Sequence, residues 1–214
     1  MPTFESVKNL HSPDPNRFPF FETIRIACGL AVHADMHLER MRRTCLFHYN
    51  EFQFGKILDS IEFPNKGFMK LNIWYNQHET EIRISDYVQV AIKKIKMVEC
   101  DPEFDYSYKY TDRNYLNNLL KSASGADEII IVKNGFVTDT TKANIVFDKN
   151  GKLYTPDTYL LNGTMRQYLL QTGKIIEKTI RAEDITTFRK MYFINAMNPL
   201  ETAPVVKCTP EIQL

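Results

Sequence analysis

The chain has 214 residues, of which 43% are hydrophobic and 25% are charged. These proportions are typical of a folded globular protein and exclude a disordered or collagen-like chain. The 27 Lys and Arg residues nearly balance the 26 Asp and Glu residues, and the net charge of +1 predicts neither nucleic acid nor a membrane surface as a partner. The length allows one large domain or two small ones.

Cysteine usage and the N-terminal residues indicate a cytoplasmic protein. The four cysteines lie far apart, with no CxxC pair and no histidine at zinc-ligand spacing, so no metal site is expected. Residues 1–18 contain no apolar stretch of the kind that a signal peptide has. The longest aliphatic run, 129–132, is too short to span a bilayer. We therefore expect a reducing compartment and no membrane partner.

The first half of the chain alternates strand and helix patterns. Residues 20–27 alternate with a period of two, which predicts a strand with Phe21, Thr23 and Arg25 on one face. Asp35 is predicted to cap a helix that ends near residue 50. A short helix is expected at 55–61, and further strands are expected at 68–75, 80–87 and 89–98.

A break in the pattern near residue 103 divides the chain into two predicted domains, 1–103 and 104–214. Beyond it, Thr111 or Asp112 is expected to cap a helix. Asn-Gly pairs at 134–135 and 150–151 predict tight hairpins. Strands are expected at 128–132, 136–139, 144–147, 152–154, 174–180 and 191–195, with a helix at 164–170 and a helical turn from 182. The order of elements predicts an α+β fold.

Five sequence blocks follow one another in an informative order. They read FFETIRIACG, HLERMRRT, YKYTDRNYLNNLL, ADEIIIVKNGFVTDTTKANIVF and LYTPDTYLLNGTMRQYLL. In this order they resemble the class IV aminotransferase family over roughly residues 20–205. The resemblance implies a D-amino acid aminotransferase-like fold with a small α/β domain and a larger strand-rich domain. It also implies pyridoxal 5′-phosphate as the cofactor, a small-molecule substrate and a homodimer.

The resemblance assigns a catalytic role to Lys109, which matches the lysine that carries the cofactor as a Schiff base. An amine in a desolvated pocket loses its proton readily, so it can attack a carbonyl and later act as a base. Most lysines in proteins are solvent-exposed and have no catalytic role, so Lys109 is selected only by the family blocks on either side of it. None of the five histidines is selected as catalytic, and His37 is expected to face its neighbours on the helix.

Asp139 stands where the family usually has a glutamate that faces the pyridine nitrogen. A carboxylate there keeps the nitrogen protonated, so the ring accepts electrons. The shorter side chain requires a shifted backbone or a bridging water, and the alternative is an aspartate that completes a hairpin turn. Asn144 also matches the family pattern, either as a cofactor contact or as a residue that fixes the strand meander.

The cofactor phosphate needs a local anion site, because the net charge offers none. Gly163 permits close approach, and Thr164 and Met165 begin a predicted helix whose backbone N–H groups point toward a bound anion. Arg40 matches the family arginine that binds the phosphate, and a guanidinium is suited to paired charge-assisted hydrogen bonds. The alternative is that Arg40 belongs to a solvated basic face.

The substrate side is less well defined. Arg25 and Thr23 are predicted to bind substrate if their face of the strand lines the cleft, with Arg25 neutralising a carboxylate; the alternative is a rim salt bridge. The region 11–20 is shorter than in the family, so substrate contacts made there are absent or come from a partner subunit.

The family contains enzymes with different reactions, and the sequence favours one of them. LNGTMRQYLL and FINAMNPLETAPV resemble the versions found in aminodeoxychorismate lyase, which forms 4-aminobenzoate and pyruvate for folate synthesis. A branched-chain or D-amino acid aminotransferase is the alternative. A non-catalytic binding module on the same fold is a third possibility, because a fold alone does not guarantee chemistry.

Overall fold

The fold is described from a computed structural model that defines residues 13–65 and 67–212. The prediction that no signal peptide is present rests largely on residues 1–12, which lie outside the described residues. The chain forms two compact units, one of residues 1–88 with 108–112, and the other of residues 89–107 with 113–214.

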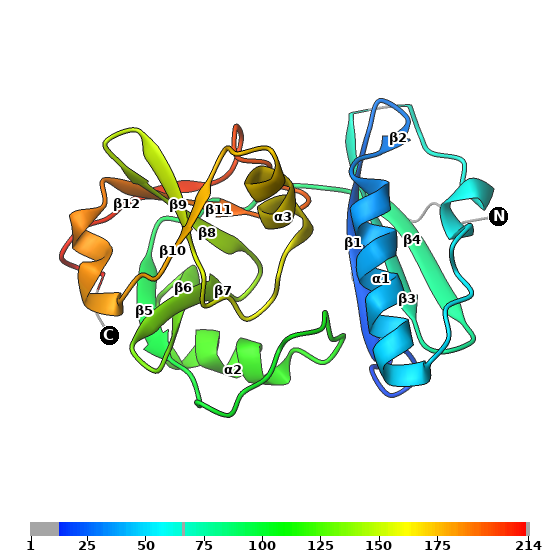
Figure 1. Cartoon of the computed structure of the whole chain (residues 1–214), viewed down its shortest axis with the longest axis horizontal. Helices are drawn as coiled ribbons and strands as arrows, with labels where there is room; N and C mark the ends of the chain where they lie inside the picture. Colours follow the sequence, from blue (N-terminus) through cyan, green and yellow to red (C-terminus); the bar gives the residue numbers. More distant parts are fainter. Residues whose placement is uncertain (1–12, 66, 213–214) are drawn as a thin grey trace. The chain divides into compact units, whose positions relative to one another are not determined.

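The first unit is an antiparallel sheet with one long helix on one face (Figure 1). The strand order is β2, β1, β3, β4. The elements are β1 (Phe20–Ala27), β2 (Leu30–Ala31), α1 (Ala34–Tyr49), the 3-10 helix η1 (Ile57–Ser60), β3 (Phe68–Tyr75) and β4 (Thr80–Asp86). The strands predicted at 20–27, 68–75 and 80–87 are therefore confirmed.

Alternation along β1 explains how this sheet is packed. Even-numbered residues from Phe20 to Ile26 are buried, whereas the odd-numbered ones are only partly buried. Ile24 and Ile26 form a core with Met41 and Cys45 of α1 and with the matching residues of β3. One face of the sheet thus carries the apolar core, and the opposite face is left to polar and aromatic side chains.

The start of α1 differs from the prediction. The cap position is His33, which has a left-handed backbone (φ 53°) and makes no side-chain capping bond. Asp35 lies one residue inside the helix instead, where its carboxylate is favourably placed near the positive end of the helix dipole. The capping preference of Asp35 therefore predicts correctly that a helix is present, but not the residue at which it begins.

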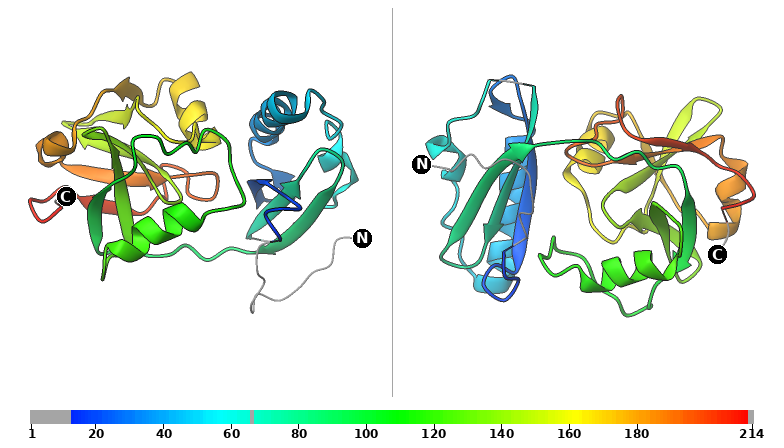
Figure 2. Two further views of the ribbon diagram at one scale, coloured as in Figure 1. Left: turned by 90° about the horizontal axis from the view of Figure 1, so that it is seen from below. Right: turned by 180° about the vertical axis from the view of Figure 1, so that it is seen from behind.

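The second unit is an eight-stranded mixed sheet with two α-helices (Figures 1 and 2). Strands run β10, β9, β8, β7, β6, β5, while β11 pairs with β8 and β12 pairs with β11. The elements are β5 (Ile95–Glu99), α2 (Asn114–Ser122), β6 (Glu128–Lys133), β7 (Phe136–Thr140), β8 (Asn144–Lys149), β9 (Lys152–Pro156), α3 (Thr164–Gln171), β10 (Ile176–Lys178), the 3-10 helix η2 (Ala182–Thr187), β11 (Lys190–Ile194) and β12 (Val205–Lys207).

The two Asn-Gly hairpins are confirmed. Asn134 and Gly135 have φ values of 53° and 77°, and Asn150 and Gly151 have 55° and 80°. Two consecutive positive φ angles are what a tight hairpin turn requires, and Asn and Gly tolerate them best. The meander from β6 to β9 therefore follows directly from sequence, and with α2 beside β6 it confirms the α+β class.

Two local predictions for this unit were wrong, and one strand was missed. The strand expected at 89–98 begins only at Ile95. Arg113, rather than Thr111 or Asp112, precedes α2, and no side chain caps that helix. Strand β12 was not predicted, because three residues give too short an alternating pattern to recognise. Within the described part of the chain, no helix has the length and apolarity to cross a membrane.

Candidate active site

Lys109 lies in a short irregular segment, residues 108–112, that joins an edge of β1 through an isolated bridge and two backbone hydrogen bonds. The backbone N–H of Phe21 donates to the carbonyl of Lys109 at 3.1 Å, and the N–H of Thr111 donates to the carbonyl of Pro19 at 2.8 Å. These two bonds attach the segment to the first unit. The sequence prediction had placed the same residues in the second domain, because hydrogen bonds between distant segments leave no local pattern.

The pairing decides which way the Lys109 side chain points. Phe20 and Tyr110 form an antiparallel bridge; Phe20 belongs to the buried core, and the partly buried Tyr110 packs against it. Their neighbours Phe21 and Lys109 therefore share the opposite face, and Lys109 Nζ lies 4.4 Å from the centroid of the Phe21 ring. The amine is held against an aromatic side chain on the face that the core does not use.

Thr23 and Arg25 lie on this same face. The hydroxyl of Thr23 accepts a hydrogen bond of 2.9 Å from Nδ2 of Asn72 on β3. The guanidinium carbon of Arg25 lies 4.1 Å from the centroid of the Phe68 ring. The structure therefore brings Lys109 and both predicted substrate residues to one face of one sheet.

Arg40 lies in a buried cluster with Glu22 and His37. Its Nε and one terminal nitrogen donate to the two oxygens of Glu22 at 2.8 and 2.5 Å, and Nδ1 of His37 lies 2.7 Å from the same carboxylate. Burial alone would raise the pKa of Glu22, but Arg40 and His37 outweigh it and lower the pKa to about 2. The expectation that His37 faces its helix neighbours was wrong, because it faces the sheet.

Burial separates Arg40 from its neighbours in the basic cluster of α1. Arg40 is 7% exposed, whereas Arg42 and Arg43 are exposed and pair with Glu39 on the helix surface. Because two nitrogens of the Arg40 guanidinium bond the buried Glu22 carboxylate, the plane of the guanidinium is held in one orientation. The structure thus supports treating Arg40 differently from the other two arginines, although its contact with phosphate remains a prediction.

In the second unit, Asp139 is held by three hydrogen-bond donors. Asn144 Nδ2 donates to Oδ1 at 2.7 Å, and the backbone N–H groups of Leu160 and Leu161 each donate to Oδ2 at 2.9 Å. Burial nevertheless dominates and raises the pKa of Asp139 to about 6. A carboxylate has about four lone-pair positions, so one acceptor position on Oδ1 remains after these three bonds.

The raised pKa makes a testable contribution to stability. Since the folded-state pKa of Asp139 lies above the ordinary 3.8, ionisation opposes folding, and stability falls as the pH rises from about 4 through about 6. Relative to Asp139→Asn, the cofactor-free wild type should lose about 2 kcal/mol between about pH 4 and pH 7. Urea unfolding of both proteins at the two pH values measures this. A difference that is constant with pH would contradict it.

Asn144 and Gly163 are in close contact. Asn144 lies opposite Asp139 in the register of β7 and β8, and its Nδ2 also donates to the carbonyl of Leu161 at 2.9 Å. A Cβ atom added at Gly163 would overlap the side-chain oxygen of Asn144. Only glycine therefore fits here, and the reason is close approach rather than a positive φ, because φ is −65°.

Gly163→Ala should consequently destabilise the protein by about 1–3 kcal/mol, because the methyl group displaces Asn144 from Asp139. Urea unfolding followed by circular dichroism measures the loss. Gly55→Ala is the matched control, since a Cβ there meets the Phe52 ring at an ordinary 3.7 Å. Equal stability of the two variants would show that the loop around Gly163 relaxes freely.

Thr164 and Met165 form the first turn of α3, directly after Gly163. Both are buried, and the Met165 side chain packs into an apolar cluster with Val146 of β8. The N-terminal turn of a helix presents backbone N–H groups, which are suited to bind an anion. The core contact of Met165 fixes the position of the turn.

Arg166 is a residue of this region that sequence analysis did not select. It is 1% exposed, and its side chain donates to Asn162 Oδ1 at 3.1 Å and to the carbonyl of Pro156 at 3.0 Å. It also pairs with Glu177. The arginine therefore braces the loop that leads into α3, and its position in the GTMR block was the signal. Glu22 and His37 were missed because nothing local marks a buried ion pair across elements.

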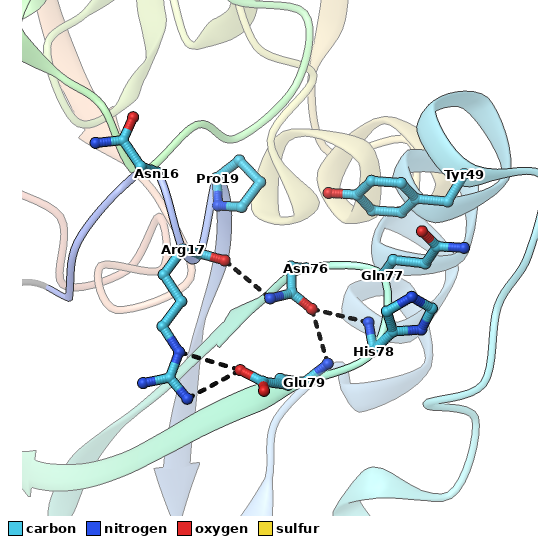
Figure 3. A pocket seen from close by; sticks show the side chains of 8 residues that line it. All are labelled: Asn16, Arg17, Pro19, Tyr49, Asn76, Gln77, His78 and Glu79. Carbon is cyan, nitrogen blue, oxygen red and sulfur yellow. Dashed lines mark hydrogen bonds and ion pairs between the residues drawn. The ribbon is translucent and has the colours of Figure 1, made fainter.

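A hollow of about 440 Å³ lies elsewhere in the first unit (Figure 3). An exposed ion pair between Arg17 and Glu79, and the loop that contains Asn76 and His78, line it. None of its lining residues is a predicted site residue, and its charged groups already satisfy each other. This hollow is not the candidate active site.

Comparison with known proteins identifies the family. The family described as amino-transferase class IV matches residues 19–208. The chain belongs to this family of enzymes, so the resemblance read from the five blocks is confirmed. A Haemophilus influenzae protein of unassigned function is 38% identical over 188 residues, which cover 86% of this chain and 100% of that protein.

Two further relatives carry more specific names. A crystal structure of a candidate 4-amino-4-deoxychorismate lyase from Haemophilus somnus 129PT is 37% identical, with a TM-score of 0.79, over 86% of this chain and 98% of that one. A candidate aminodeoxychorismate lyase of Schizosaccharomyces pombe is 42% identical over 62 residues, 28% of this chain and 27% of that protein. The small unit and the larger strand-rich unit are as the resemblance implied.

Proposed function

We propose that the protein is a pyridoxal-phosphate-dependent lyase that converts aminodeoxychorismate to 4-aminobenzoate and pyruvate in folate synthesis. The observation that carries the lyase assignment is the 37% identity with the Haemophilus somnus protein across nearly its whole length. The presence of Lys109, Thr23 and Arg25 on one face supports an amine-directed reaction on an anionic substrate.

The residues of the chain fit the proposed cofactor. Asp139 keeps one acceptor position for a protonated ring nitrogen, and such a cation would favour its ionised form. The first turn of α3 and the guanidinium of Arg40 offer donors of the kind that phosphate needs. Gly163 lets the Asn144 side chain lie against the start of α3, because a Cβ at residue 163 would overlap the Asn144 side-chain oxygen. When bound, pyridoxal phosphate supplies an electron sink for negative charge beside the amine-bearing carbon.

Lys109 performs the proton transfers of the proposed reaction. Released by the substrate amine, its Nζ takes the ring proton from the amine-bearing carbon. The enolpyruvyl group then leaves as the carbon–oxygen bond breaks, the ring becomes aromatic, and the same amine returns a proton to the departing fragment to give pyruvate. The Phe21 ring beneath Nζ holds the amine in place between the two transfers.

A spectroscopic experiment tests the proposal. Protein mixed with pyridoxal phosphate should show a visible absorbance band, and borohydride reduction with peptide mapping should find the label on Lys109. Aminodeoxychorismate should then release pyruvate, detected with lactate dehydrogenase. Conversion of the cofactor to its pyridoxamine form by branched-chain or D-amino acids would favour the aminotransferase alternative. Label scattered over surface lysines would favour the non-catalytic module.

The proposal includes a cytoplasmic homodimer. The four cysteines form no disulfide in the structure, which is compatible with a reducing compartment. Sedimentation velocity of the purified protein tests the oligomeric state. A mass near twice the 25.0 kDa of the chain is expected, and a stable monomer that releases pyruvate at full rate would contradict the dimer.

A further inference from the structure

Two cations lie side by side on the face of the first sheet that carries Lys109. Arg25 of β1 and Lys70 of β3 are directly opposite each other in the antiparallel register, so their side chains share this face. Like charges in that position destabilise a sheet. Among the residues that the structure describes, no acidic group pairs with either side chain. Within the described part of the chain, the sheet therefore carries a pair of like charges with no acidic side chain to compensate it.

The local environment of the pair is partly desolvated. Arg25 Nε is buried and has no hydrogen-bond partner, and the guanidinium carbon lies over the Phe68 ring, 4.1 Å from its centroid. Lys70 is partly buried, and burial lowers its pKa. A buried donor without a partner costs free energy, and for Arg25 Nε the residues that the structure describes supply no acceptor. An anion with two oxygens is suited to satisfy both cations together.

The neighbouring positions set this pair apart from the rest of the face. Arg83, opposite Asn72 on β4, is already paired with Glu81 and lies 5.1 Å from the Trp74 ring centroid. Its charge is therefore neutralised within the chain. Arg25 and Lys70, by contrast, lie directly opposite each other, and neither forms an ion pair with an acidic residue of the described chain. Both positive charges can therefore act on the same bound anion.

The distance from Lys109 limits which anion fits. Lys109 stands beside Phe21, four residues before Arg25 on β1, and this spacing corresponds to roughly 13 Å along a strand. The Thr23 and Asn72 side chains, which are hydrogen-bonded to each other, occupy the interval. A carboxylate attached to the amine-bearing carbon itself is too close to the amine to span this interval. A carboxylate several bonds away is better matched.

We propose that Arg25 and Lys70 together bind a substrate carboxylate that lies several bonds from the reacting amine, and that they select amines of this class over simple α-amino monocarboxylates. The inference rests on the proposed function, because it takes Lys109 as the residue that meets the amine. It adds Lys70 as a specificity-determining residue. A cyclic amine with a ring carboxylate belongs to the selected class, and a branched-chain amino acid does not.

The chain carries its own reporter for this inference. Trp74 is the only tryptophan, is 7% exposed and lies on the same face, opposite Phe21. Its fluorescence can be titrated with cyclohex-1-ene-1-carboxylate and, as the uncharged counterpart, cyclohex-1-ene-1-carboxamide. Neither compound absorbs where tryptophan is excited. The full chain is titrated both with and without pyridoxal phosphate.

The carboxylate should bind more tightly than the carboxamide to the wild type. Lys70→Met should raise the dissociation constant of the carboxylate about tenfold, Lys70→Arg should keep it within about threefold, and the exposed control Lys56→Met should leave it unchanged. Equal binding of carboxylate and carboxamide, or equal affinity of wild type and Lys70→Met, would overturn the inference. Near-identical circular dichroism and melting of the variants shows that the comparison is between folded proteins.

The titration separates this inference from the proposed function. If Lys109 takes no cofactor, the proposed function fails, yet the titration without cofactor still reports on Arg25 and Lys70. If the cofactor binds at Lys109 and Lys70→Met leaves carboxylate affinity unchanged, the inference fails alone. In a working lyase, Lys70→Met should raise KM about tenfold with kcat nearly constant, a pattern that a structural defect does not produce.

Discussion

Lys109→Ala is expected to reduce turnover by roughly a thousandfold or more while the protein stays folded. The lysine supplies both proton transfers of the proposed reaction, and the neighbouring backbone bonds that hold its segment do not involve its side chain. Pyruvate release under saturating substrate measures the effect. Pyridoxal phosphate should still bind, without the label on residue 109 after borohydride reduction.

Two further variants make this result specific. Lys109→Arg keeps the positive charge over Phe21 but does not release a proton at neutral pH, so it should be as inactive as the alanine variant. Lys152→Ala, at the exposed first residue of β9, should retain full activity. Activity of Lys109→Ala within tenfold of the wild type would remove Lys109 from the mechanism.

Glu22→Gln should produce the largest loss of stability, about 3–5 kcal/mol, because it leaves the Arg40 guanidinium buried without its counter-charge. The pKa of Glu22, lowered from the ordinary 4.5 to about 2, implies stability that is present above about pH 4.5 and lost as the pH falls toward 2. Urea unfolding followed by Trp74 fluorescence reports on the same unit. The variant should also lose affinity for pyridoxal phosphate, since the Arg40 plane is no longer fixed.

The matched control for this change is Glu79→Gln in the same unit. Glu79 also pairs with an arginine, Arg17, but both side chains are more than half exposed. Exposed pairs contribute less than about 1 kcal/mol, so this variant should unfold almost as the wild type does. If both variants lose the same free energy, the buried cluster has no special role in stability.

The elements with strong local patterns were predictable from sequence. The period of β1 and the paired Asn-Gly turns of the β6–β9 meander depend on neighbouring residues alone, and both appear as expected. The family blocks selected Asp139, Asn144 and Gly163 as cofactor-binding candidates with different roles, and the structure brings Asn144 into contact with both of the others. Whether they bind the cofactor remains a prediction.

Other features depend on contacts that the sequence does not display. The ion pair of Glu22 with Arg40 joins a strand to a helix, and the pairing of Lys70 with Arg25 depends on a strand register that composition cannot give. The first residues of α1 and α2 also differ from expectation, because no side chain caps either helix. Such details are set by tertiary packing rather than by local preference.

The attachment of residues 108–112 to β1 has a consequence for folding during synthesis. Phe20 emerges from the ribosome long before its bridge partner Tyr110. The edge of β1 at Phe20 therefore lacks its partner during synthesis, although most of the first unit has already been made. An unpaired edge is where nascent chains associate wrongly. Residues 108–112 should therefore protect the first unit from aggregation once they are synthesised, whereas residues 89–107, which precede them, belong to the second unit and contain β5, the partner of β6.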